Sequence, residues 1–155
     1  MTADQQTIRD LVDGIRFAML TTQDGGRLVS RPMTPLRIED DLTLLFVTQR
    51  DTDVAQQSVA GPVNLAFAEK GTFVSISGTA ELLDDVELKK DLWSIATEAY
   101  TEEGPEDPSN VVLAVHPESA SYWESASAPV TIVSMLKAAV TNGKPEAGDH
   151  GTVEL

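Results

Sequence analysis

Hydrophobic positions recur along the chain with two periods, one typical of helices and one of strands. Residues 2–15 carry apolar side chains on one helical face, and Thr2 with Gln5 has capping-box spacing. Residues 72–83 instead alternate apolar and mostly polar positions, as a half-buried strand does. By these criteria we predict helices at 2–15, from 51 or 52 to 59, at 84–100 and at 131–140, and strand-like runs within 17–33 and at 42–47, 63–68, 72–83, 111–117 and 120–125.

Glycines mark a turn and an irregularity between and within the predicted strands. Asp24-Gly25-Gly26 supplies the positive φ angles of a tight hairpin, and Gly78 marks a bend or bulge within its strand. Short strands with few inserted helices predict a mainly β fold, a six-stranded antiparallel barrel with peripheral helices. We expect a single domain over residues 1–141 and a mobile C-terminal tail over 142–155.

Composition narrows the classes of partner. The 155 residues carry a formal net charge of −14, which argues against nucleic acid or an anionic membrane as a partner. There is no cysteine, so disulfides and thiolate chemistry are excluded. Asp4, Arg9, Asp10, Asp13 and Arg16 interrupt the first 20 residues, where a signal peptide would need an apolar core. We expect a cytoplasmic protein.

Familiar catalytic signatures are missing. The sequence has no phosphate-binding glycine loop, no nucleophile elbow and no zinc-binding histidine pair. His116 and His150 are the two histidines, and without cysteines they predict no metal site. His116 reads better as a surface or hydrogen-bonded histidine than as a catalytic one. The acidic run from Glu98 to Asp107 reads as a solvated loop. The catalytic residues therefore stay unknown.

Basic residues gather around the second half of the first hairpin. Arg27, Arg31 and Arg37 lie in or beside a span from 25 to 38 that has no acid, and Arg50 follows one strand later. With nearby hydroxyls, this group could hold a phosphate monoester through charge-assisted hydrogen bonds. The same arginines could equally neutralise neighbouring carboxylates, and the sequence does not decide between these two interpretations.

Two further stretches suit a small-molecule ligand. Pro32 and Pro35 mark a strand edge whose neighbouring backbone groups are free for a flat heterocycle, unless the strand simply ends there. Residues 46–57 join a strand to a helix N-terminus, where backbone N–H groups favour anions. Trp123 lies in a strand, where a tryptophan usually packs in the core but also stacks on ligands or anchors an interface.

In order along the chain, several motifs resemble the general stress protein branch of the pyridoxamine 5′-phosphate oxidase-like family, the flavin-binding split barrels. The resemblance extends from about Ile15 to the tail. The motifs are FAMLTT (17–22), SRPM (30–33), LLFVTQRDT (44–52), VNLAFA (63–68), FVSISGTAELLDD (73–85), the helix that contains Trp93, GPEDP (104–108) and ASYWES (120–125).

The resemblance implies a split barrel that forms homodimers and binds FMN at the subunit interface. It implies cofactor contacts from Arg31, Pro32, Met33, Val47, Thr48, Arg50, Thr52 and Trp123, with Thr52 at the phosphate and Trp123 near the flavin ring. Relatives generally follow the strand-to-helix join with a lysine or an Arg-Lys pair, whereas this chain has Asp53 and Val54. Arg31 and Arg50 are the candidate replacements at the phosphate.

Three functions follow from the resemblance. The first is a flavin-dependent oxidoreductase of unknown substrate, with a stress-related role. The second is a reductase that binds a deazaflavin, and the third is a flavin-binding or empty dimeric scaffold or sensor without catalysis. A true pyridoxamine 5′-phosphate oxidase is not expected, because the arginine- and histidine-bearing C-terminal segment of that enzyme has no match in PEAGDHGTVEL.

Overall fold

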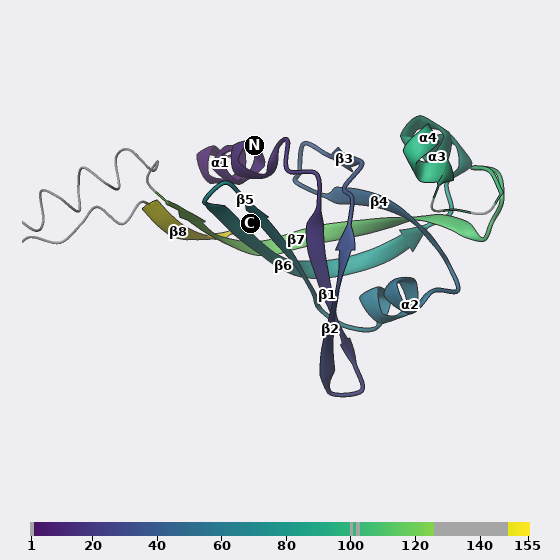
Figure 1. Cartoon of the computed structure of the whole chain (residues 1–155), viewed down its shortest axis with the longest axis horizontal. Coiled ribbons are helices and arrows are strands. Elements are labelled where there is room, and N and C mark those ends of the chain that lie inside the picture. Colours follow the sequence, from purple (N-terminus) through teal and green to yellow (C-terminus); the bar gives the residue numbers. More distant parts are fainter. Residues whose placement is uncertain (1, 100, 102, 126–148) are drawn as a thin grey trace, which may run out of the picture.

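The computed structural model describes residues 2–99, 101, 103–125 and 149–155 and shows a sheet with helices packed around it (Figure 1). The predicted helix at 131–140 and the residues 142–148 of the predicted tail lie outside these ranges. The elements are α1 (Ala3–Val12), β1 (Ala18–Asp24), β2 (Arg27–Met33), β3 (Arg37–Ile38), β4 (Leu44–Gln49), α2 (Asp53–Ala60), β5 (Val63–Glu69), β6 (Thr72–Leu83), α3 (Val86–Leu92), α4 (Ile95–Glu98), β7 (Asn110–Glu124) and β8 (Asp149–Glu154).

The strands form one antiparallel sheet in the order β2-β1-β5-β6-β7-β4-β3, and β8 pairs with β7. The mainly β antiparallel fold is as predicted from the sequence. The described residues contain eight strands rather than the six expected, because residues 37–38 and 149–154 also pair. The two runs predicted at 111–117 and 120–125 are one continuous strand, β7.

The glycines predicted to form a turn and a bulge do so in the structure. Gly25 and Gly26 both have positive φ, 55° and 88°, and they connect the paired residues Asp24 and Arg27. The pairing of β6 with β7 shifts register at Gly78, which lies opposite Pro117. A Cβ atom on Gly78 would lie 2.0 Å from the carbonyl oxygen of His116, so no other residue fits this bulge without movement.

The helix predicted at 84–100 is divided. The N–H of Trp93 donates to the carbonyl of Lys90 and ends α3, and Trp93 itself has extended backbone angles. The Ser94 hydroxyl then accepts from the Thr97 N–H at 3.3 Å, which is a new helix cap. In the part of the chain that the structure describes, no helix is both long and apolar enough to cross a membrane.

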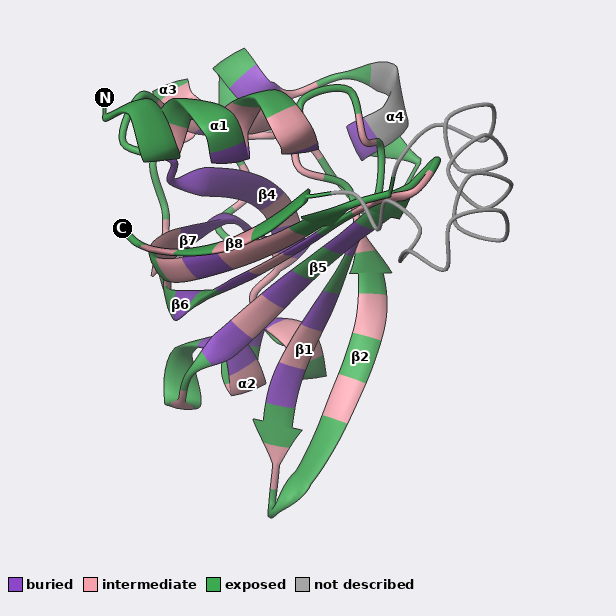
Figure 2. Cartoon of the chain, turned by 90° about the vertical axis from the view of Figure 1, so that its left-hand side faces the viewer, coloured by how far each residue is buried: buried purple, intermediate pink, exposed green. Residues whose placement is uncertain are grey.

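The main core lies between one face of the sheet and α1. In Figure 2, buried residues alternate with more exposed ones along β1 and β5, so one face of these strands is covered. Phe46 and Phe67 are the largest apolar side chains buried there, and Ile8 and Val12 of α1 pack against the same cluster. A smaller cluster around Leu92 fixes α3 on β4 and β7.

Residues 149–154 contradict the prediction of a mobile tail, since they form β8 along residues 119–124 of β7. Gly151 makes this pairing possible, because a Cβ atom there would lie 2.7 Å from the Tyr122 ring. Leu155 packs against the core and donates its N–H to the carbonyl of Glu118 at 2.9 Å. The sequence has little apolar signal in this segment, so the pairing could not be read from periodicity.

Lys89 of α3 is completely buried and ties this helix to the loop that precedes β7. Its ammonium group donates to a carboxylate oxygen of Asp84 at 2.8 Å and to the carbonyls of Asp107 at 3.1 Å and Asn110 at 2.8 Å. All three donors of the ammonium are therefore used. This contact fixes the position of α3, and of α4 that follows it in the chain.

We expect Lys89→Met to destabilise the fold by roughly 3 kcal/mol, because it removes the donor from buried carbonyl oxygens. Lys90→Met is the matched control, since the ammonium of Lys90 makes only exposed ion pairs with Glu87 and Glu106. Denaturant unfolding of both variants measures the difference. Equal free energies of unfolding for the two variants would contradict the assigned role of Lys89.

Candidate functional site

A pocket of about 370 Å³ lies where β2, β4, the N-terminus of α2 and the α4 segment meet. Its lining comes from residues far apart in sequence and has two characters. The apolar part is made by Phe17, Pro32, Met33, Leu36 and Val47. The polar part is made by Arg16, Thr34, Thr48, Gln49, Thr52, Thr97 and Thr101. Five threonine hydroxyls beside an apolar wall suit a ligand with a flat ring and a polar chain.

The strand-to-helix join forms one end of this pocket. Thr52 is the N-cap of α2, and its hydroxyl accepts from the Ala55 N–H at 3.4 Å. The same hydroxyl donates to the carbonyl of Gln49 at 2.7 Å and lies 3.4 Å from the hydroxyl of Thr48. The cap predicted from the sequence is present, and the pocket borders it.

Five of the eight predicted cofactor residues lie together in the pocket lining. These are Pro32, Met33, Val47, Thr48 and Thr52. Their contact with a cofactor stays a prediction. Arg31, Arg50 and Trp123 do not line the pocket, and each lies in a different environment.

Arg31 lies under α2. Its guanidinium group donates to the Thr22 hydroxyl at 2.6 Å and to the Gln57 side-chain oxygen at 2.9 Å, with a longer contact of 3.4 Å to the carbonyl of Leu20. Gln57 belongs to α2 and Thr22 to β1. Arg31 therefore joins the helix to the first hairpin, and the role predicted for it at a phosphate remains a prediction.

Arg50 points toward the loop before β7. Its guanidinium group donates to the carbonyl of Pro108 at 3.3 and 3.4 Å and lies 3.5 Å from a carboxylate oxygen of Asp84. The hydrogen bond from Lys89 lowers the pKa of Asp84, and the charges of Lys89 and Arg50 lower it further. The Asp84 carboxylate is thus held ionised between two cations.

Two other arginines of the basic group make local ion pairs. Arg27 lies 2.9 Å from a carboxylate oxygen of Asp24, and Arg37 lies 2.9 Å from one of Glu39. Of the two interpretations left open by the sequence, neutralisation of neighbouring carboxylates describes these two residues. The four arginines do not converge on one point.

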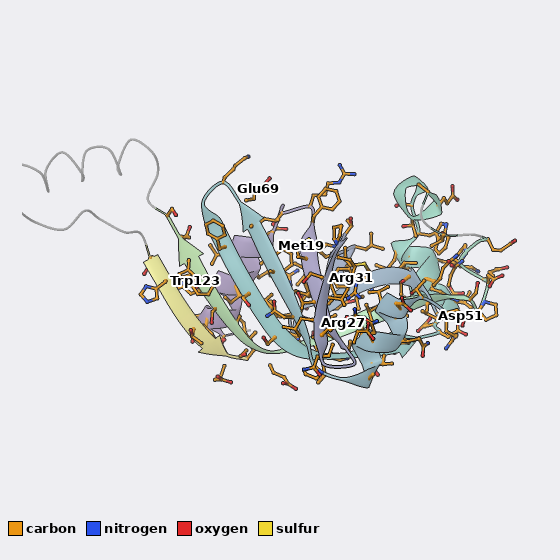
Figure 3. The ribbon with its side chains drawn as sticks, turned by 60° about the horizontal axis from the view of Figure 1, so that its bottom comes forward. Met19, Arg27, Arg31, Asp51, Glu69 and Trp123 are labelled. Carbon is orange, nitrogen blue, oxygen red and sulfur yellow. The ribbon has the colours of Figure 1, made fainter. Side chains whose placement is uncertain are left out.

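Trp123 is 48% exposed and lies near β8, at the opposite end of the molecule from Asp51 (Figure 3). Its cross-strand partner is Phe73, which is 47% exposed. A core position is therefore excluded for this tryptophan. Within a single chain it lies away from Arg31 as well as from Asp51 (Figure 3).

Thr34, one of the hydroxyls beside the basic residues that the sequence suggested for a phosphate, also lines the pocket. Sequence reasoning missed six lining residues, namely Arg16, Phe17, Leu36, Gln49, Thr97 and Thr101. Thr97 and Thr101 have the spacing of one helical turn, and the Thr101 hydroxyl donates to the carbonyl of Thr97 at 2.9 Å. That spacing was the available signal for them. Arg16 lies over the ring of Phe17, 5.0 Å from its centroid, just before β1. No sequence signal connected this pair to β4.

His116 has partners that the sequence did not show. Its Nε2 atom lies 2.9 Å from a carboxylate oxygen of Glu81, and its Nδ1 atom lies 3.2 Å from the Thr43 hydroxyl. It does not line the pocket. The backbone N–H of Thr43 and its hydroxyl lower the pKa of nearby Asp41. Across the described ranges, no group of three or more carboxylates and histidines is placed to hold a metal ion.

Comparison with known proteins gives consistent matches. General stress protein 26 of Bacillus subtilis (strain 168) is 29% identical over 120 residues, which cover 74% of this chain and 84% of that protein. The structure of a general stress protein 26 from Jannaschia sp. CCS1 has 27% identity and a TM-score of 0.79, and the match covers 99% of this chain and 100% of that one.

A third relative has a name that mentions cofactors. The general stress FMN/FAD binding protein from Xanthomonas citri has 27% identity and a TM-score of 0.66, with 80% of this chain and 90% of that chain covered. The profile of the family described as pyridoxamine 5′-phosphate oxidase like matches residues 3–146. The chain therefore belongs to the pyridoxamine 5′-phosphate oxidase-like family, and its similarity within that family is to general stress proteins.

Proposed function

We propose that this protein binds a flavin in the pocket between β2, β4 and α2 and acts as a flavin-dependent oxidoreductase. The observation that carries the proposal is the double character of the pocket, with an apolar wall and a row of threonine hydroxyls. The apolar wall suits an isoalloxazine ring, and the hydroxyls suit a ribityl chain. The FMN- and FAD-binding relative from Xanthomonas citri supports the same ligand class.

The lining residues would bind and orient the flavin rather than react with it. The described lining has hydroxyls, one amide and one guanidinium group, and none of these accepts a proton readily at neutral pH. A bound flavin supplies the redox chemistry, while the protein positions it and limits access of water. The names of the relatives support a role under stress.

We further propose that the protein is a homodimer in which a second chain covers the outer face of the sheet beside the pocket. Met19, Phe73 and Trp123 are large, exposed and apolar, and they lie on the face opposite the core. Pro32, which lines the pocket, is the cross-strand partner of Met19. The exposed apolar face is therefore continuous with the pocket, and such faces usually mark interfaces.

The flavin proposal predicts a protein that quenches FMN fluorescence at micromolar concentration and is yellow when it retains the cofactor. Val47→Phe should weaken flavin binding at least tenfold, because the larger ring fills the apolar part of the pocket. Val59→Phe is the matched control, since Val59 is exposed on α2 outside the pocket.

Fluorescence titration and the visible spectrum measure both effects, with thermal unfolding as a check that the variants fold. A colourless protein that leaves the fluorescence of both FMN and riboflavin unchanged would rule out the flavin proposal. If a flavin binds but no turnover occurs with any nicotinamide or electron acceptor, the proposed flavin binding stands and the proposed oxidoreductase activity is refuted.

The dimer proposal predicts that Phe73→Asp converts the protein to monomers, because the variant buries a carboxylate in an apolar interface. Val59→Asp, at a similarly exposed valine on α2, should leave the oligomeric state unchanged. Sedimentation equilibrium gives the mass of each form. A wild-type protein that is monomeric at micromolar concentration would refute the dimer.

A further inference from the structure

We propose that the pocket takes a flavin that is uncharged at the end facing α2, namely riboflavin, in preference to its 5′-phosphate. This inference rests on the proposed flavin-binding function and specifies the ligand of that same pocket. It depends on where the charged side chains around the strand-to-helix join lie and on which partners they already have.

The cations that could hold a phosphate at this join are engaged elsewhere. Arg31 donates to Thr22 and Gln57, and it lies beneath α2 rather than in the pocket lining. Arg50 donates to the carbonyl of Pro108 and pairs with Asp84. Moving either guanidinium to a ligand would break contacts that hold α2 or the loop before β7. No lysine contributes to the described lining.

The positive end of the α2 dipole is already compensated by the chain. Asp53 is the first residue of α2 and Asp51 precedes the cap; both are exposed and flank Thr52 in the sequence, and neither lines the pocket itself. An acidic side chain in the first turn interacts favourably with the helix dipole, so a phosphate at the same helix end would gain less from that dipole. A phosphate dianion near these two carboxylates would be repelled.

The Thr52 hydroxyl is also committed within the chain. It accepts from the Ala55 N–H and donates to the Gln49 carbonyl. The hydroxyl hydrogen therefore points into the cap and is not available to a phosphate oxygen. A neutral polyol does not need a hydrogen from the Thr52 hydroxyl, because its own hydroxyls can donate to Thr52 and Thr48.

Arg16 is the one charged residue among the described lining residues, and it belongs to a different element. It precedes β1 and lies over the ring of Phe17, whereas the predicted phosphate position is the join between β4 and α2. A phosphate could reach Arg16 only if the flavin bound with its chain toward β1.

The test is a pair of fluorescence titrations of the full-length protein with riboflavin and with FMN. We expect riboflavin to bind about fivefold more tightly at low ionic strength, which corresponds to the repulsion of like charges a few ångströms apart in a hydrated site. Added salt should reduce this difference, because it screens the repulsion. Tighter binding of FMN, weakened by salt, would overturn the inference.

Charge-changing variants locate the effect. Asp53→Lys should tighten FMN binding about tenfold and leave riboflavin binding unchanged, since it adds a cation at the join. Asp40→Lys is the control, because Asp40 is an exposed carboxylate in the turn before β4 and does not line the pocket. An equal gain from both variants would show a general charge effect and would overturn the inference.

The outcomes separate this inference from the function on which it rests. If neither flavin binds, the proposed function fails and the inference fails with it. If FMN binds more tightly than riboflavin, flavin binding stands and the inference alone fails. Loss of that FMN preference in Arg16→Ala would then place the phosphate at Arg16, in the reversed orientation.

Discussion

The pairing of β7 with three other strands determines how the two strands that line the pocket, β2 and β4, are placed relative to each other. Residues 110–115 of β7 pair with β4, residues 119–124 pair with β8, and β6 follows the opposite edge along the length of β7. β4 leads directly into the cap of α2. On the other side of β7, the sheet continues from β6 through β5 and β1 to β2. Two strands that contribute to the pocket thus reach it from opposite edges of one fifteen-residue strand.

The bulge between β6 and β7 lets this long strand remain continuous. Pro117, which has no N–H to donate to a neighbouring strand, ends the first of the two runs predicted from the sequence. The register shift at Gly78 places Pro117 at the irregularity, where regular pairing is interrupted in any case. The irregularity thus accommodates the proline within one continuous strand, opposite a residue that has no side chain.

The parts of the fold that were predictable depend on neighbours in sequence. The Gly25-Gly26 turn and the Thr52 cap follow from local backbone preferences, and both are present. The division of the long helix at Ser94 also has a local signal, because serine is a favoured cap, although the apolar periodicity concealed it. β8 depends on pairing with a distant strand, and its sequence has no strong pattern of its own.

In the candidate site, too, the residues with a local sequence signal were predicted and those placed by distant contacts were not. The residues on β2 and β4 were found because motif order indicated them, whereas Arg16 and the threonines near α4 enter through packing of segments distant in sequence. Arg31 and Arg50 have the residue type expected at a phosphate, but their partners lie 26 and 58 residues away. Such partners decide whether an arginine is available, and no local pattern shows them.

The contact of Arg31 with Gln57 has a consequence for the entropy of ligand binding. It joins α2 to β2, so the cap at Thr52 and the edge at Pro32 belong to segments that are already connected without a ligand. A ligand that touches both would not have to bring them together and order them. Such preorganisation lowers the conformational cost of association, so more of the contact energy is available as affinity.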